Sequence, residues 1–358
     1  MRRHWQKTPL VVRGAMPGVQ PLPRAQLFAL TADDTVESRL IERRDRSGWT
    51  LKHGPFARSA LPPLKRPHWT LLVQGVDLHD DATHALLRSF SFVPDARLDD
   101  LMISWASDGG GVGPHFDSYD VFLLQVHGQR RWRIGRTHDA KLDPNAPLKI
   151  LRHFVPEQEL VLDAGDMLYL PPQWAHDGVA VGGDCMTYSI GMRAPQRGEL
   201  AAELAARLAD ALDDATLYRD PRQPATSRPA AIPAGLQTFA AAAVRSLVAE
   251  AGATERVLGE LLSEPKAHVW FERAVKPWRP GAVDLDRRTR MLYDARRVYI
   301  NGDSVRAAGK DAALLRRLAD ERGLDARAMR DASPAAHALL REWFHAGWLR
   351  RRRPSLRT

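Results

Sequence analysis

The stretch SWASDGGGVGPHFDSYDVFLLQVHGQRRWRIG, residues 104–135, decides how the rest of the chain is interpreted. At its centre stands the tripeptide His115-Phe116-Asp117. Successive side chains of a β-strand point to opposite faces, so in a strand His115 and Asp117 would present an imidazole and a carboxylate on one face. The spacing therefore predicts two ligands of a metal site.

A third ligand is available from His176, in the segment GDMLYLPPQWAH at residues 165–176. Here an apolar strand is expected to run into a Pro-Pro turn, with the histidine just beyond it. Two histidines and one carboxylate form the ligand set of non-haem Fe(II) oxygenases, which leaves coordination positions open for a co-substrate and O2. The pattern favours an iron site of this type.

An anchor for the co-substrate is predicted on the strand that follows. Residues 119–126 read as an apolar strand, 127–129 as a tight turn and 130–135 as the returning antiparallel strand. On that strand Arg130, Trp132 and Ile134 would share a buried face. A guanidinium on an apolar wall needs a partner, and a carboxylate pairs with it in bidentate geometry. A dicarboxylate bound to the metal would fit.

Simpler interpretations of these motifs remain open at this point. The chain has 13 histidines, so a His-x-Asp match arises easily by chance, and a second one occurs at His79-Asp80-Asp81. That second motif precedes a helical pattern, so we expect its aspartates to cap a helix. For His115 the simpler role is a hydrogen-bonded histidine at a strand end. The glycine run at residues 109–113, the inward arginine and the second histidine together favour the metal role.

Three segments resemble one known family when they are taken together. They are GVGPHFDSYDVFLLQVHGQRRWRIG (111–135), GDMLYLPPQWAHDGVA (165–180) and MTYSIGMRAP (186–195). They resemble the JmjC-type 2-oxoglutarate oxygenases, and most closely the bacterial ribosomal oxygenases that hydroxylate an arginine of the sixteenth large-subunit ribosomal protein. The resemblance implies that Fe(II) is bound by His115, Asp117 and His176. It further implies that Arg130 holds the distal carboxylate of 2-oxoglutarate, with Ser104 and Ser189 lining that pocket.

The activity implied by this resemblance is hydroxylation of a protein side chain with release of succinate and CO2. A cationic substrate side chain would need acids or aromatics at the mouth of the barrel, and the candidates are Asp108, Tyr119 and Asp120. Ordinary strand packing for Tyr119 and surface exposure for Asp120 are equally open. Other functions also remain: a histidyl hydroxylase of another ribosomal protein, a metal-binding cupin that is not an oxygenase, or a nucleic-acid-binding protein.

The expected fold class is α+β, beginning with a catalytic domain over residues 1–195. From about residue 101 to 195 the chain alternates short apolar runs with turns, which is typical of a double-stranded β-helix, the cupin or JmjC barrel. Before it we expect residues 9–12, with His4 and Trp5, to pair at a sheet edge. The remaining expected elements of this part are a helix over 28–44, a buried strand over 70–76 and a helix over 82–90.

Residues 196–265 are expected to form a helical region. Alanine-rich or amphipathic helices are predicted over 197–212 and 236–262, separated by a proline-punctuated linker at 221–233. Their apolar stripes could pack within the chain or against a second subunit. The family resemblance favours the second reading, a homodimer formed through this region.

Residues 266–358 are expected to form a winged-helix-like domain with a basic tail. The pattern predicts a hairpin over 295–305 that turns at Asn301-Gly302, then helices within 307–324 and from 334 onward. Four consecutive arginines, Arg350 to Arg353, read as a solvated tail. A winged helix commonly binds nucleic acid, but no base-reading set is evident.

Composition bounds the class of protein. The 358 residues are 44% hydrophobic and 27% charged, as in ordinary globular proteins. A single cysteine, Cys185, excludes an internal disulfide, and no apolar run approaches the roughly 20 residues of a membrane span. We therefore expect a cytoplasmic protein. The net charge of +9 is compatible with a polyanionic neighbour such as RNA, and equally with the usage of an arginine-rich genome.

Overall fold

The computed structural model describes residues 1–44 and 48–352. The chain divides into two compact units, Met1–Ala194 and Pro195–Thr358. In the described residues, no helix combines the length and the apolar character that a bilayer span requires.

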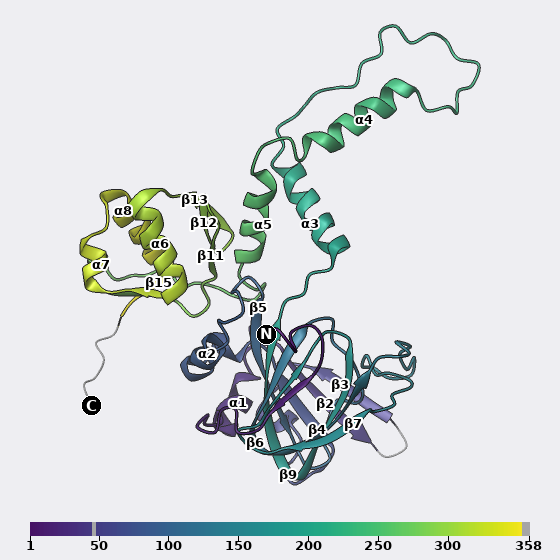
Figure 1. The fold of residues 1–358 in the computed structure, drawn as a ribbon, viewed down its shortest axis with the longest axis vertical. Helices are drawn as coiled ribbons and strands as arrows, with labels where there is room; N and C mark the ends of the chain where they lie inside the picture. Colours follow the sequence, from purple (N-terminus) through teal and green to yellow (C-terminus); the bar gives the residue numbers. More distant parts are fainter. Residues whose placement is uncertain (45–47, 353–358) are drawn as a thin grey trace. The chain divides into compact units, whose positions relative to one another are not determined.

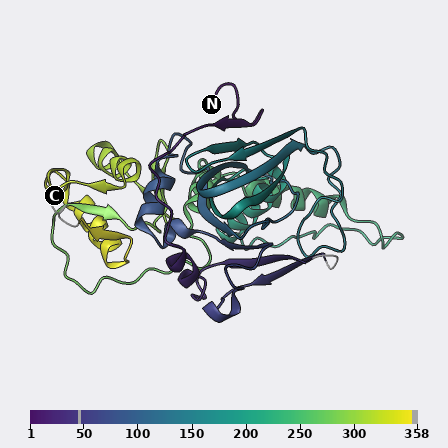
Figure 2. The same cartoon turned by 90° about the horizontal axis from the view of Figure 1, so that it is seen from below.

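The first unit is built on one antiparallel sheet, which Figure 2 shows curling on itself. Its strand order is β1-β8-β6-β9-β5-β4-β2-β3, with β7 pairing with β6. Most of these strands are labelled in Figure 1. The strands are β1 (Leu10–Val12), β2 (Ser38–Arg44), β3 (Gly48–His53), β4 (Trp69–Val73), β5 (Leu98–Ala106), β6 (Asp120–Arg136), β7 (Gln158–Leu162), β8 (Met167–Leu170) and β9 (Trp174–Met192).

Two long strands, β6 and β9, form the centre of this sheet and pair along most of their lengths. The predicted hairpin turn at residues 127–129 is therefore wrong, because these residues lie within β6. Of these three residues, only Gly128 has a positive φ, at 64°. The β6–β9 register shifts on both sides of His127, so the strand contains a β-bulge instead of a turn.

The segment expected to be helical over 28–44 is also different. It contains the end of α1 (Arg24–Leu30) and then β2. Leu40 and Ile41 are buried, and β2 pairs with both β3 and β4. Burial and pairing on both sides outweigh the local helical pattern, because β-strand preference is largely set by tertiary context.

Three other predictions for this unit are confirmed. All five residues of β4 are buried. Helix α2 (Asp81–Arg88) starts at Asp80, whose carboxylate accepts a hydrogen bond from the Thr83 N–H at 2.8 Å. The second His-x-Asp motif thus contributes a helix cap. Strand β1 lies at the sheet edge beside β8, although His4 and Trp5 are in turns.

The core beneath the sheet is aromatic. Trp69 and Trp105 are almost completely buried, with ring centroids 4.5 Å apart, and Phe28 of α1 meets Trp105 edge-on at 5.3 Å. Truncating a buried tryptophan typically costs about 3–5 kcal/mol. This cluster fixes α1 against β4 and β5, and β5 carries part of the site described below.

The second unit begins with three helices, α3 (Arg197–Asp210), α4 (Ala234–Ser246) and α5 (Ala253–Ser263). The single helix expected over 236–262 is thus two helices. The break covers residues 247–252 and ends at Gly252, whose φ of 83° is left-handed and incompatible with a continuous helix. Helices α3 and α5 pack together around Leu208 and Val257, whereas α4 buries none of its residues.

The rest of this unit combines two small sheets with three helices. One sheet has the order β11-β12-β13 and the other β14-β10-β15. The predicted hairpin is confirmed, with Asn301 and Gly302 both at positive φ. The elements are β10 (Val283–Leu285), β11 (Met291–Tyr293), β12 (Arg297–Ile300), β13 (Asp303–Arg306), α6 (Gly309–Glu321), β14 (Gly323–Leu324), α7 (Ala326–Arg330), α8 (Pro334–His345) and β15 (Leu349–Arg351).

The expected basic tail is partly a strand. Arg350 and Arg351 belong to β15, which pairs with β10. The Arg352 guanidinium donates to the Asp284 carboxylate at 2.8 Å. These arginines are therefore held in the domain by strand pairing and an ion pair, and Arg353 lies outside the described residues.

Candidate metal centre and co-substrate pocket

The loop between β5 and β6 carries His115 and Asp117, so they do not lie in a regular strand as predicted. His115 is nevertheless held in extended geometry by an isolated antiparallel bridge to His176 of β9. The two residues exchange backbone hydrogen bonds of 3.0 and 2.7 Å. This bridge brings together residues that are 61 positions apart in sequence.

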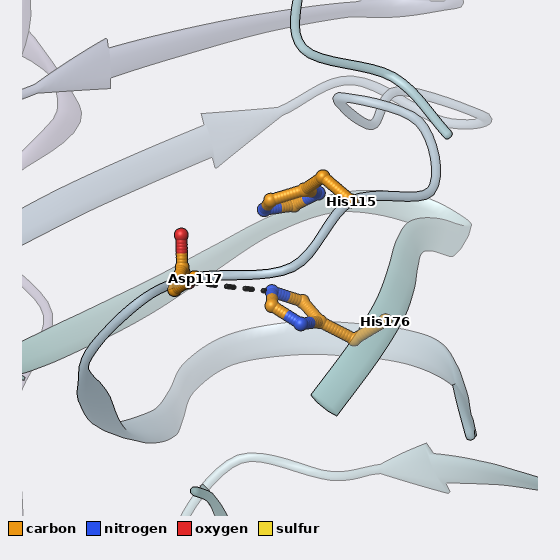
Figure 3. A group of neighbouring side chains, drawn as sticks. All are labelled: His115, Asp117 and His176. Carbon is orange, nitrogen blue, oxygen red and sulfur yellow. Dashed lines mark ion pairs between the residues drawn. The ribbon is translucent and has the colours of Figure 1, made fainter. Parts of the chain in front are cut away.

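The three predicted ligands converge, as Figure 3 shows. One ligand atom from each of His115, Asp117 and His176 lies within 4.8 Å of the others. The His176 Nε2 is 3.7 Å from an Asp117 oxygen, and the two imidazole centroids are 4.2 Å apart. These separations suit three ligands of one ion.

Hydrogen bonds orient both imidazoles. Nδ1 of His115 lies 2.9 Å from the Gly113 carbonyl, and Nδ1 of His176 lies 2.9 Å from the Trp174 carbonyl. A carbonyl can only accept, so each Nδ1 must carry the proton, which leaves each Nε2 free to bind a metal. Burial, reinforced by His115, lowers the pKa of His176 to about 4. The imidazole is thus in its neutral, metal-binding form at neutral pH.

Arg130 of β6 is buried in the same region, only 3% exposed. Its Nη1 donates to Ser104 Oγ at 2.8 Å and to Thr187 Oγ1 at 3.3 Å, and its Nη2 donates to the Gly178 carbonyl at 3.2 Å. Its Nε has no hydrogen-bond partner, and in the described residues no carboxylate pairs with it. A buried, uncompensated guanidinium is costly, so this position calls for an anion.

A cavity of about 630 Å³ connects the three ligands with Arg130. Glycine at 178 makes the arrangement possible, because a Cβ there would lie 2.8 Å from Arg130 Nε and closer still to Trp132. The predicted residues that line the cavity are His115, Asp117, His176, Arg130, Ser104, Ser189 and Tyr119.

Two predicted substrate contacts are not in this cavity. Asp108 is exposed and accepts from the Gly183 N–H at 3.3 Å. Asp120 is fully buried and accepts from Tyr169 Oη (2.6 Å), Gln6 Nε2 (2.9 Å) and Arg97 Nη2 (3.2 Å). Neither lines the cavity, and Asp120 holds neighbouring protein groups.

The cavity has acidic residues that the sequence analysis missed. Asp99 and Asp100, at the start of β5, both line it. Asp100 accepts from Gln74 Nε2 at 2.8 Å, and Asp99 accepts from Arg193 at 3.3 Å. The alternation along β5 was a usable signal, because Asp100, Met102 and Ser104 are two apart and all line the cavity. Thr187, the second hydroxyl on Arg130, was also missed.

Known protein families match this chain along most of its length. A JmjC domain model matches residues 85–200 and a ROXA-like winged-helix model matches residues 253–350. The ribosomal protein uL16 3-hydroxylase of Escherichia coli is 33% identical over 317 residues, covering 87% of this chain and 83% of that protein. The probable ribosomal oxygenase of Haemophilus influenzae is 34% identical over 228 residues, covering 62% of this chain and 53% of that protein.

Solved structures extend the likeness to the whole chain. The X-ray structure of E. coli ycfD matches with a TM-score of 0.87 and 31% identity, covering 98% of this chain and 96% of that chain. A structure of YcfD, a ribosomal oxygenase from E. coli, in complex with cobalt and 2-oxoglutarate matches with a TM-score of 0.83 and 30% identity, at the same coverage. The predicted cupin-type barrel with a C-terminal winged helix is thereby confirmed. The chain belongs to the ribosomal oxygenase family of JmjC-domain proteins.

Proposed function

We propose that this protein is an Fe(II)- and 2-oxoglutarate-dependent hydroxylase whose substrate is an arginine side chain of ribosomal protein uL16. One observation carries the co-substrate assignment: Arg130 is buried without a carboxylate partner in the cavity that also contains the His115, Asp117 and His176 cluster. A cupin that binds only a metal gives no reason for such a guanidinium.

Each residue then has a definite task. His115, Asp117 and His176 would hold Fe(II), because two neutral imidazoles and one carboxylate suit this ion. Arg130, with Ser104 beside it, would bind the distal carboxylate of 2-oxoglutarate. Once bound, iron and 2-oxoglutarate supply the oxidising chemistry, in which O2 provides one atom to a substrate C–H bond and one to succinate, with release of CO2.

The chain's own contribution is binding, orientation and exclusion of water. Val121, Leu123 and Trp132 form an apolar wall of the cavity. An apolar wall leaves few competing hydrogen bonds, so the charge of Arg130 acts on the bound carboxylate in a medium of low dielectric.

The cationic substrate side chain would enter near Asp99 and Asp100. These carboxylates and the Tyr119 ring line the cavity, and together they can bind a guanidinium by ion pairing and by stacking. The net charge of +9 would repel a basic ribosomal protein at long range. Recognition of arginine therefore depends on these local carboxylates and not on the net charge of the chain. The similarity to the E. coli uL16 3-hydroxylase supports uL16 as the protein that carries the arginine.

The test combines two products of one reaction. Purified protein, Fe(II), 2-oxoglutarate and uL16 are incubated, and we expect succinate together with one added oxygen atom on a uL16 arginine. His115→Ala should abolish both, whereas the matched variant His79→Ala, in the second His-x-Asp motif, should retain both. Turnover by His115→Ala would remove the metal assignment. If uL16 gains no oxygen, and another ribosomal protein supplied in its place gains one on a histidine, the substrate changes to the histidyl alternative.

We also propose that the helical region mediates a homodimer. Helix α4 buries none of its residues, and Val244 and Val248 are 67% and 60% exposed. Leu236 and Val244 lie in α4 and Val248 lies two residues beyond its end, and together they offer an exposed apolar surface that a second copy would cover.

Sedimentation at micromolar concentration tests this assembly. We expect a species of twice the 40.0 kDa chain mass, and Val244→Asp with Val248→Asp should convert it to the monomer. A wild-type protein that sediments as a 40.0 kDa monomer would contradict the proposal.

A further inference from the structure

The bulge in β6 determines which of its side chains face the cavity. Before the bulge, the odd-numbered Val121 and Leu123 line the cavity, and after it the even-numbered Arg130 and Trp132 do. A regular strand alternates strictly, so without the bulge Arg131 would take the inward position of Arg130. The extra residue thus aims the guanidinium.

The side chain of Gln125 closes this bulge. Gln125 is fully buried, and its Nε2 donates to the His127 carbonyl at 2.7 Å and more weakly to the Gly128 carbonyl at 3.4 Å. Ladder partners are disrupted where a strand bulges, so these carbonyls need another donor. Gly128 is required here because a Cβ on it would collide with the Asp184 carbonyl.

The other end of the same amide fixes a hydroxyl beside Arg130. Thr187 Oγ1 donates its proton to Gln125 Oε1 at 2.7 Å. A hydroxyl has one proton, so the remaining lone pairs of Thr187 accept from Arg130 Nη1. Because the amide oxygen accepts this proton, Thr187 is oriented as an acceptor toward the guanidinium.

We propose that Gln125 is a positioning residue for the co-substrate: it holds the β6 bulge and the Thr187 hydroxyl so that Arg130 presents its free donors to the carboxylate of 2-oxoglutarate. Gln125 does not itself line the cavity. The inference rests on the proposed function, since it concerns how that site binds its co-substrate.

The test uses Gln125→Leu, with Gln125→Met as a second variant that keeps the length of the side chain. The matched control is Gln129→Leu, the same change in the same bulge, because Gln129 is exposed and bonds outward to Asp163 Oδ1 at 2.7 Å. Thermal stabilisation is measured first with Co(II) alone and then with Co(II) and increasing 2-oxoglutarate, so that binding is observed without turnover.

We expect Gln125→Leu to keep the stabilisation by Co(II) and to bind 2-oxoglutarate roughly ten- to a hundredfold more weakly, as for a lost contact to a charged group. In turnover, KM for 2-oxoglutarate should rise by a similar factor with a smaller change in kcat. Gln129→Leu should match wild type in both assays.

Wild-type affinity for 2-oxoglutarate in both Gln125 variants would overturn the inference. Equal loss of the Co(II) and 2-oxoglutarate responses would also overturn it, because that result indicates a general structural role. Failure of wild type itself to bind 2-oxoglutarate would instead reject the proposed function.

Discussion

Strand β6 carries two buried charges, ten residues apart, with opposite surroundings. Asp120 at its start is fully buried and accepts hydrogen bonds from a tyrosine, a glutamine and an arginine. Arg130 in its second half is almost as buried, yet its polar contacts are two hydroxyls and one carbonyl. One charge is neutralised within the fold and the other is not.

The difference separates a structural network from a binding site. The partners of Asp120 include Gln6 of the N-terminal segment and Arg97 just before β5, so the acid joins separate parts of the first unit. The fold tolerates Arg130 uncompensated because the residue faces a cavity where a ligand can supply the missing anion. Burial alone therefore does not identify a functional charge, and the identity of its partners does.

The largest expected effect on stability comes from the hydrogen-bond network around Asp120. Asp120→Ala leaves Arg97 and Tyr169 without their buried acceptor, and such losses cost roughly 3–5 kcal/mol of unfolding free energy. Urea denaturation measures this cost, with the exposed Asp108→Ala as the control near zero. The folded fraction of the variant should still bind 2-oxoglutarate. Weakened arginine-substrate binding with unchanged stability would instead return Asp120 to the substrate role.

Arg130→Ala should have the opposite profile. It removes a charge that has no acid partner, so the unfolding free energy should change little or rise. The affinity for 2-oxoglutarate should fall by roughly 1.5–3 kcal/mol, because a charge-assisted contact is lost. Calorimetric titration of 2-oxoglutarate in the presence of Co(II) measures this, with Arg131→Ala on the opposite face as control. Equal affinity for 2-oxoglutarate in Arg130→Ala and Arg131→Ala would contradict the role of Arg130 as the uncompensated charge that binds the co-substrate.

A smaller effect is expected at Asp100, one of the two β5 carboxylates that line the cavity. Asp100→Asn keeps the shape of the side chain but removes its charge, so KM for the uL16 substrate should rise by roughly fivefold, or about 1 kcal/mol. KM for 2-oxoglutarate should not change, and Asp108→Asn should have no effect on either value. A rise in KM for uL16 in the Asp108 variant alone would instead support Asp108 as the substrate contact, as predicted from the sequence.

The smallest effect concerns Asp166, a second acid whose charge is neutralised within the fold. Burial opposes its charge, but the N–H groups of Gly14 and Asp163 and the Arg13 guanidinium outweigh burial and lower the pKa below the ordinary 3.8. A lowered pKa contributes stability that is present above pH 3.8 and is lost as pH falls through the folded-state value. Acid unfolding curves should show a weaker pH dependence in Asp166→Asn. Superimposable curves would show that the interactions of Asp166 contribute nothing to the pH dependence of stability.

Much of the site could be predicted because its signals are local. The His-x-Asp spacing, the histidine after Pro-Pro and the alternation of Arg130, Trp132 and Ile134 depend on residues close in sequence, and all of these residues are brought together or buried as expected. The cap at Asp80 is equally local.

The errors came from contacts between distant segments. Residues 38–44 form a strand because β3 and β4 lie on either side of it, which a helical local pattern cannot reveal. His-Gly-Gln reads as a turn, but its environment beside β9 makes it a bulge. Acids at the cavity were expected next to the metal motif, whereas β5 places Asp99 and Asp100 in the cavity lining from another part of the sheet.

The central claim is that this chain hydroxylates an arginine of uL16, and mass spectrometry of ribosomal proteins tests it most directly. Cells with the gene, without it, and with the gene restored as wild type or as His115→Ala are compared. We expect one added oxygen atom on a uL16 arginine, absent on deletion, regained with wild type and not with His115→Ala. An oxygen on that arginine that persists after deletion, or a uL16 that carries none in any strain, would contradict the account.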